Sequence, residues 1–444
     1  MTTRDDCGRA LDWIDPVRAL RAFASEPYTL LLQGGGTQPW GRKSYLCAFP
    51  AFVIEDADPA RGFERLKAGF RPARHGAEQG FAGGYAGLMA YDLGQAFERL
   101  PAHPPGRAAC PAIAMGWYEA VLVFDHQTQS LCVQGDPAAA QRLIDRLGRG
   151  GDQTGPQDAG AGTLTQDWPD TRYLDAVARA RDYIAAGDIF QVNLSHAFTG
   201  RIEGEDAPLR VFERLAANSP AAFSAVFVLS EDQVILTNSP ERFLKASASG
   251  AVETRPIKGT RPRRADPVQD RAEAEALSAS IKDRAENLMI VDLMRNDMSR
   301  VCRSGSVVVP HLCDLESYAN VHHLVSVVEG ELAADHDVFD LLAASFPPGS
   351  ITGAPKVRAM EIISELEGEP RGPYCGALGW IDGSAALDLN VMIRTAALRR
   401  SGGRWRASVR SGGGIVADSD PQAEYEETLT KASALRRAFG VEAE

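Results

Sequence analysis

The sequence predicts a large globular protein in which β-strands and α-helices are mixed. The chain has 444 residues, 44% of them hydrophobic and 24% charged, a length and composition that suit a substantial buried core. Its first third is rich in aromatic and β-branched runs bounded by glycine and proline, which indicate strands. Amphipathic helical patterns alternate with strand-like runs in the remainder.

The first 146 residues are expected to form a sheet-rich N-terminal lobe. Residues 16–24 have apolar spacing that suits a short helix. Strands are predicted at 28–32, 44–49, 51–54, 81–91 and 112–124. Residues 147–166 contain six glycines and almost no large apolar side chain, so they cannot bury much surface. We expect this segment to be a linker or a surface loop.

Residues 167–444 are expected to form the second and larger region. Amphipathic helices are predicted at 173–186, 209–217, 267–298 and 422–437, and a helix at 357–366. Strands are predicted at 189–194, 222–229, 234–237, 243–245, 252–255 and 405–409. Apolar residues recur at helical spacing in the first group and form short β-branched runs in the second.

Charge and cysteine usage exclude several classes of protein. The net charge of -12 argues against nucleic acid or an anionic membrane as the main partner. No signal-peptide pattern opens the sequence and no run of about 18 apolar residues is present, so we expect a cytoplasmic protein. The seven cysteines are scattered without a C-x-x-C pair, which indicates neither a disulfide framework nor a zinc site.

Residues 254–263 are the most unusual stretch. Lys258 lies there among Arg255, Arg261 and Arg263, in a segment braced by two prolines. Crowding by cations would disfavour the charged ammonium and make the lysine a better nucleophile or base. The alternative is a solvated basic loop.

Two acidic pairs occur on predicted helices. Asp283 and Glu286 are three residues apart, as are Glu424 and Glu427, so each pair emerges on one helix face. Converging carboxylates of this kind would suit Mg²⁺, which prefers oxygen ligands. Solvated helix faces in an acidic protein are the alternative.

Two glycine-rich segments lie between these helices. Residues 347–356 open onto a helix whose N-terminal N–H groups favour an anion, and residues 411–414 could bring backbone N–H groups to a ligand. The polar residues His323, Tyr374 and Arg394 stand in apolar surroundings. Taken singly, each suits a structural role as well as a ligand role.

In this order, the segments resemble the chorismate-utilising enzyme family. The matching segments are IFQVNLS (189–195), SPERF (239–243), RPIKGTRPR (255–263), DRAENLMIVDLMRND (283–297), HHLVS (322–326), GSITGAPK (349–356), IRTA (393–396) and EYEETLTK (424–431). The resemblance is dense over residues 170–440 and looser over 83–94. It implies an α+β fold of two interleaved lobes, with central antiparallel sheets packed together and helices outside.

The resemblance also implies a role for individual residues. It assigns Glu286 and Glu427 to Mg²⁺, with Glu424 and Asp283 in support. Substrate contacts are implied for Tyr374, Arg394, Gly412, Gly414, Thr352 and Gln191. Glu241 is implied as the general acid for the C4 hydroxyl of chorismate, with His323 assisting.

Two positions distinguish branches of the family. Members that add water carry a lysine where this chain has Gln191, and members that form anthranilate carry a small residue where it has Lys258. The resemblance therefore implies amination of chorismate to 4-amino-4-deoxychorismate, for 4-aminobenzoate and folate, through a Lys258 adduct at C2. Ammonia would come from a separate glutamine amidotransferase subunit, since no Gly-x-Cys-x-Gly segment occurs in the sequence. An anthranilate-forming enzyme and a catalytically inactive relative are the alternatives.

Overall fold

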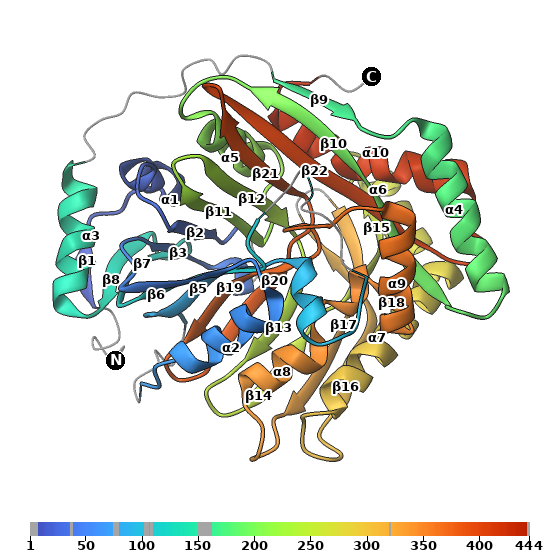
Figure 1. Ribbon diagram of the computed structural model, residues 1–444, viewed down its shortest axis with the longest axis horizontal. Coiled ribbons are helices and arrows are strands. Elements are labelled where there is room, and N and C mark those ends of the chain that lie inside the picture. The colour runs from blue at the N-terminus through green and yellow to red at the C-terminus, as the bar shows by residue number, and fades with distance from the viewer. Residues whose placement is uncertain are drawn as a thin grey trace.

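Two antiparallel sheets form the centre of the protein (Figure 1). The computed structural model describes residues 8–35, 39–73, 80–101, 106, 110–149, 162–318 and 321–441. Within these residues the larger sheet has twelve strands. In spatial order they are β1 (Arg9–Leu11), β8 (Ser130–Gly135), β7 (Ala120–Asp125), β3 (Lys43–Cys47), β2 (Thr29–Gln33), β11 (Phe223–Ser230), β12 (Gln233–Ser239), β21 (Thr395–Ser401), β22 (Arg404–Ile415), β10 (Gln191–Ile202) and β18 (Gly353–Ala354), with β9 (Thr163–Gln166) also paired to β10.

The second sheet has ten strands within the same residues. Their order is β15 (Ile257–Pro262), β17 (Val321–Glu331), β14 (Ala251–Thr254), β13 (Arg242–Ala246), β20 (Leu387–Val391), β19 (Ala377–Asp382), β5 (Gly84–Met89), β6 (Ile113–Tyr118) and β4 (Phe52–Asp56), with β16 (Val308–Ser317) paired to β17. The strands β15 and β17 stand at one end of this sheet, which is where the segment around Lys258 lies.

Helices cover the outer faces of both sheets (Figure 1). They are α1 (Pro16–Leu20), α2 (Pro59–Gly69), α3 (Pro137–Arg149), α4 (Asp170–Ala185), α5 (Ala207–Asn218), α6 (Pro267–Ala279), α7 (Ile281–Ser299), α8 (Val338–Ser345), α9 (Lys356–Glu367) and α10 (Pro421–Ala438). One apolar cluster contains residues of both sheets, for example Phe227 of the larger sheet and Leu88 of the second. A second packs α1, α3, α5 and α10 on the larger sheet, and a third packs α2, α7 and α8 on the other. The predicted α+β class, with packed central sheets and outer helices, is confirmed.

Strands from both halves of the chain share each sheet. β2 pairs with β11 in the larger sheet, and β5 pairs with β19 in the other. The predicted linker is only partly seen: residues 147–149 end helix α3, residues 163–166 form β9, and residues 150–161 lie outside the described residues. The two halves are therefore interleaved, with one apolar core between sheets to which both contribute.

Two of the predicted elements are each two separate elements in the structure. The run 112–124 is two strands in different sheets, β6 and β7, because the exposed Glu119 interrupts the apolar residues where the chain crosses over. The predicted helix 267–298 is two helices. Ser280 leaves helical geometry, and its side chain accepts the Asp283 N–H as the N-cap of α7.

Two expectations concern membranes and thiols. In the part of the chain that the structure describes, no helix has the length and apolarity needed to cross a bilayer. Six cysteines fall in that part, and all six are free thiols.

Candidate active site

Lys258 lies on strand β15, at one end of the second sheet. Residues 257–262 of this segment thus form an edge strand rather than a loop, and β15 pairs with β17 through Lys258–Leu324 and Thr260–His323. Gly259 makes a bulge between these pairs with a φ of 83°, a conformation that favours glycine. A Cβ there would lie 3.0 Å from the side chain of Asp283. Glycine therefore lets helix α7 pack close to the strand and brings its carboxylates toward Lys258.

The pKa of Lys258 is lowered, but not by the neighbouring arginines. Burial is the main cause, the Lys431 ammonium adds to it, and the carboxylates of Glu286, Glu241 and Glu427 act in the opposite direction. The predicted crowding by Arg255, Arg261 and Arg263 was wrong, because each arginine turns toward a carboxylate of its own.

Each of the three arginines in residues 254–263 has a carboxylate partner. Arg255 is bonded to Glu316 and also stands over the Trp40 ring. The distance from Arg261 Nη2 to Asp283 Oδ2 is 3.6 Å, and Arg263 Nε donates to Asp270 Oδ1 at 2.9 Å. The three arginines therefore stabilise the strand through their ion pairs. Lys258 is left as the candidate reactive group of this segment.

The glycines of β22 leave the space that the Lys258 ammonium uses. Gly412 and Gly414 lie within β22, where they pair with Ser195 and Asn193 of β10. A Cβ at Gly414 would lie 2.1 Å from Gln191 Nε2 and 3.3 Å from Lys258 Nζ. The structure thus brings Gln191, Gly414 and Lys258 together from three strands of two sheets.

Glu241 has the pKa expected of an acid that works near neutral pH. It is buried between β12 and β13, and burial raises its pKa to about 7, opposed by a hydrogen bond from the Ser350 side chain and by the charge of Lys258. Glu241 and Lys258 are close enough for each charge to shift the pKa of the other. The candidate proton donor, Glu241, and the candidate nucleophile, Lys258, therefore share one site.

His323 is buried and neutral at pH 7. Burial, together with the positive charge of Arg394, lowers its pKa to about 4, and its Nδ1 is 2.8 Å from the Thr260 hydroxyl. Burial also lowers the pKa of Arg394. Arg394 has a φ of 52°, and within the described residues no carboxylate lies at ion-pair distance from it. A half-buried guanidinium without a counter-charge is suited to an anionic ligand.

Tyr374 and Thr352, two further residues predicted to bind substrate, are both buried. Tyr374 is buried, its ring centre is 5.8 Å from the Arg371 guanidinium, and burial raises its pKa. Thr352 is buried too, and its hydroxyl donates to the carbonyl oxygen of Pro348 at 2.8 Å. Its carbonyl accepts the Asn193 N–H, so Thr352 fixes the wall next to Gly414.

The four acidic residues extend from α7 and α10, and lysines lie between them. Lys282 Nζ is 3.7 Å from Glu424 Oε1, and Lys431 Nζ is 2.7 Å from Glu427 Oε1. Burial and the neighbouring carboxylates Asp283 and Glu424 raise the pKa of Glu286. Burial opposes ionisation of Glu427 as well, but Lys431 and other lysines hold its pKa below the usual value.

Carboxylate oxygens of this kind are suitable ligands for a divalent cation, but the four side chains do not converge on one point. Burial and then Glu427 raise the pKa of Glu424, a repulsion that a cation would relieve. Within the described residues, no group of three His, Cys, Asp or Glu side chains is arranged to hold a metal ion. Mg²⁺ would therefore require the Lys282 and Lys431 ammonium groups to move aside.

A profile of the chorismate binding enzymes matches residues 23–437. The chain belongs to this family. It is 44% identical over 363 residues to aminodeoxychorismate synthase component 1 of Klebsiella aerogenes, covering 80% of this chain and 77% of the relative. It is 39% identical to anthranilate synthase component 1 of Thermus thermophilus, covering 87% and 83%. The solved anthranilate synthase component I of Streptococcus pneumoniae has a TM-score of 0.80 at 31% identity, covering 90% and 93%.

Several residues of the site were not predicted. Lys431 neutralises Glu427 and donates to the carbonyl oxygen of Gly412 at 3.1 Å. Its position four residues after Glu427 is the spacing of helical ion pairs, a signal that was available. Glu367, Arg371 and Arg410 form a buried ion cluster behind Ser195. They come from α9, the following turn and β22, and nothing in their local sequence indicates that they meet.

Proposed function

We propose that this chain aminates chorismate at C4 to give 4-amino-4-deoxychorismate, with Lys258 as the nucleophile. The observation that carries the proposal is the position of Lys258. Its ammonium stands beside Gly414 and Gln191, has a lowered pKa, and shares the site with Glu241, whose pKa is about 7. An enzyme that forms anthranilate would not need a lysine at this position, whereas a mechanism that passes through a covalent adduct would need one.

The first step joins Lys258 to the ring. Nζ, as the neutral amine, attacks C2, the ring double bonds shift, and the C4–O bond breaks as Glu241 gives its proton to the departing hydroxyl, which leaves as water. Ammonia then attacks C4, the double bonds shift back, the C2–N bond breaks with its electron pair going to Lys258 Nζ, and a proton from the new C4 ammonium group returns to Glu241. One ammonia enters and one water leaves overall, and the two allylic steps replace one difficult substitution.

The remaining residues bind and orient the substrate. Arg394 and Tyr374 would hold the enolpyruvyl carboxylate with the backbone at Gly412 and Gly414. Glu286 and Glu427, supported by Glu424 and Asp283, would hold Mg²⁺, which supplies positive charge for the ring carboxylate. His323 would assist Glu241 as a neutral hydrogen-bonding partner. We assign the ammonia to a separate glutamine amidotransferase subunit.

Product analysis tests this function. The purified chain is incubated with chorismate, Mg²⁺ and ammonium chloride, and products are separated by chromatography and identified by mass. Aminodeoxychorismate should accumulate, and chelation of Mg²⁺ by EDTA should stop its formation. Anthranilate as the main fluorescent product would contradict the proposal, and so would the absence of any turnover at saturating ammonium.

The rate should fall as pH rises through the pKa of Glu241. Only the protonated carboxyl can donate to the leaving hydroxyl, and the pKa of Glu241 is about 7, so the active form is depleted above neutral pH. We expect kcat to decrease above that pKa, with a limiting slope of about tenfold per pH unit once Lys258 is wholly in its neutral form. Rate measurements from pH 6 to 9 with free ammonia held constant check this. A Glu241→Gln variant should be slow at every pH and lack this limb.

A further inference from the structure

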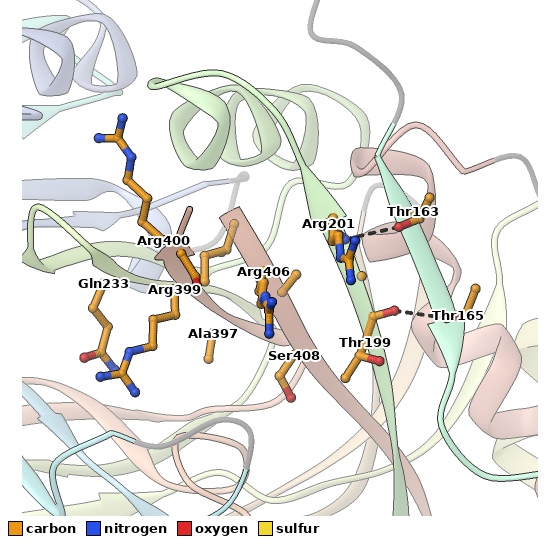
Figure 2. Close-up of a pocket in the computed structure, with 14 residues that line it drawn as sticks. Thr163, Thr165, Thr199, Arg201, Gln233, Ala397, Arg399, Arg400, Arg406 and Ser408 are labelled. Atoms are coloured by element: carbon orange, nitrogen blue, oxygen red, sulfur yellow. Dashed lines mark hydrogen bonds between the residues drawn. The ribbon is translucent and has the colours of Figure 1, made fainter. Parts of the chain in front are cut away.

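Three arginines stand side by side across neighbouring strands of the larger sheet, far from the site just described. In the strand register, Arg399 of β21 is opposite Arg406 of β22, and Arg406 is opposite Arg201 of β10. Gln233 of β12 and Thr163 of β9 flank the three at either end. Figure 2 shows Arg399, Arg406 and Arg201 along one wall of a pocket. We call these three residues the arginine row.

The arginine row lacks counter-charges. Its neighbours are paired, since Arg400 is 3.3 Å from Glu205 and Arg404 is 3.0 Å from Glu203. Among the described residues, no carboxylate lies at ion-pair distance from any member of the row. Directly opposite residues on antiparallel strands have Cβ atoms about 4.5–5.5 Å apart, and like charges there destabilise the sheet. An anion bound between the guanidinium groups would remove this repulsion.

The pocket beside the arginine row has room for such an anion. Its volume is about 670 Å³, within the range of about 300–1,000 Å³ for small-molecule sites. The next cross-strand row carries small side chains, namely Ala397, Ser408, Thr199 and Thr165. The Thr199 hydroxyl donates to Asp167 and the Thr165 hydroxyl to a carbonyl. The small side chains therefore leave space for a ligand, and the arginines provide hydrogen-bond donors.

This pocket is separate from the chorismate site. Arg406 and Gly414 lie on the same face of β22, eight positions apart, which corresponds to about 26 Å along a strand. The buried Arg410, bonded to Glu367, lies between them on that face. An anion at the arginine row would therefore be out of reach of Lys258.

We propose that the arginine row is a second ligand site, for a compact anion with two or more negative charges such as a phosphate or a polycarboxylate. Guanidinium groups pair with both kinds of anion through two parallel hydrogen bonds. The protein carries a net charge of -12, so its overall field repels anions and the attraction must be local. Adjacent unpaired arginines on a rigid sheet provide that local field.

Thermal unfolding and titration calorimetry with two probes test the proposal. Pyrophosphate and citrate, each compared with potassium chloride of equal ionic strength, should raise the Tm of the full chain. Arg406→Gln should weaken binding by about tenfold or more, because it removes a charge-assisted contact, and should abolish the Tm shift. Arg404→Gln makes the same charge change on the same strand at an arginine already paired with Glu203, and should bind as the wild type does.

The outcomes separate this site from others. A response to one probe alone identifies the anion as phosphate-like or carboxylate-like and supports the proposal. Equal Tm shifts in the wild type and Arg406→Gln, or no shift beyond that of potassium chloride, would overturn it. Arg394→Gln should keep the shift, since that arginine belongs to the chorismate site. If Arg406→Gln leaves probe binding intact but weakens capture of an amidotransferase subunit, the row is a protein contact and the proposal fails.

Discussion

Replacing Lys258 by alanine should slow formation of aminodeoxychorismate by on the order of a hundredfold or more, because the covalent route is lost. Lys258 Nζ lies beside the space left by Gly414, and no other lysine takes its place, since Lys431 is bonded to Glu427 and to the carbonyl of Gly412. Ammonia would then have to react without the adduct, and the product should shift toward anthranilate. Chromatography of the products with ammonium as nitrogen source measures both effects.

The control for this experiment is an exposed lysine on the same sheet. Lys245 lies on β13 with its side chain toward solvent, so Lys245→Ala should leave rate and product unchanged. Lys258→Arg keeps a cation but not a nucleophile, and should be as slow as the alanine variant. If Lys258→Ala kept the wild-type rate and product, the lysine would not be the nucleophile, whether or not the protein aminates chorismate.

Glu367→Gln should lower the free energy of unfolding by about 3–5 kcal/mol, since it leaves buried charges without a partner. The Glu367 carboxylate is fully buried and accepts from Arg371 Nη2 at 2.7 Å and from Arg410 Nη2 at 2.8 Å. It also accepts from the N–H and hydroxyl of Ser195. Glutamine keeps the shape but not the charge, so both guanidinium groups would stay buried with reduced compensation. Urea denaturation followed by circular dichroism measures the loss.

The pH dependence of stability provides a second measure of the same cluster. Burial alone would raise the pKa of Glu367, but Arg371 and Arg410 outweigh it and the pKa is lowered. A carboxylate with a lowered pKa stabilises the fold above its usual pKa, and this contribution is lost as pH falls through the folded-state value. The variant should therefore lose less stability than the wild type on acidification.

Glu365 offers a matched control on the same helix. It is exposed and accepts from the Tyr183 hydroxyl at 2.7 Å, so Glu365→Gln should change the unfolding free energy by less than about 1 kcal/mol. Equal midpoints for Glu365→Gln and Glu367→Gln would show that the buried cluster does not depend on its carboxylate.

Local sequence rules predicted the elements well where packing agreed with pattern. The helices α4 and α5 and the hairpin of β11 and β12 follow directly from apolar spacing. The split of α6 from α7 was missed although Ser280 and Asp283 have the spacing of an N-cap. The crossover between β6 and β7 was missed although the charged Glu119 marks it, and only the partners of the two apolar strands place them in different sheets.

The sequence by itself determined the chemistry available to this protein: a lysine in the segment 254–263, carboxylate pairs on two helices, and the order of motifs that marks the family. Only the tertiary structure decided which charges meet. In the structure the arginines near Lys258 pair with Glu316, Asp283 and Asp270. Burial is therefore the main cause of the lowered pKa of Lys258. It also set Arg201 opposite Arg406, some two hundred residues away in the chain. Strand register and burial arise from long-range pairing, and a residue's charge acquires its energy only from the neighbours that this pairing supplies.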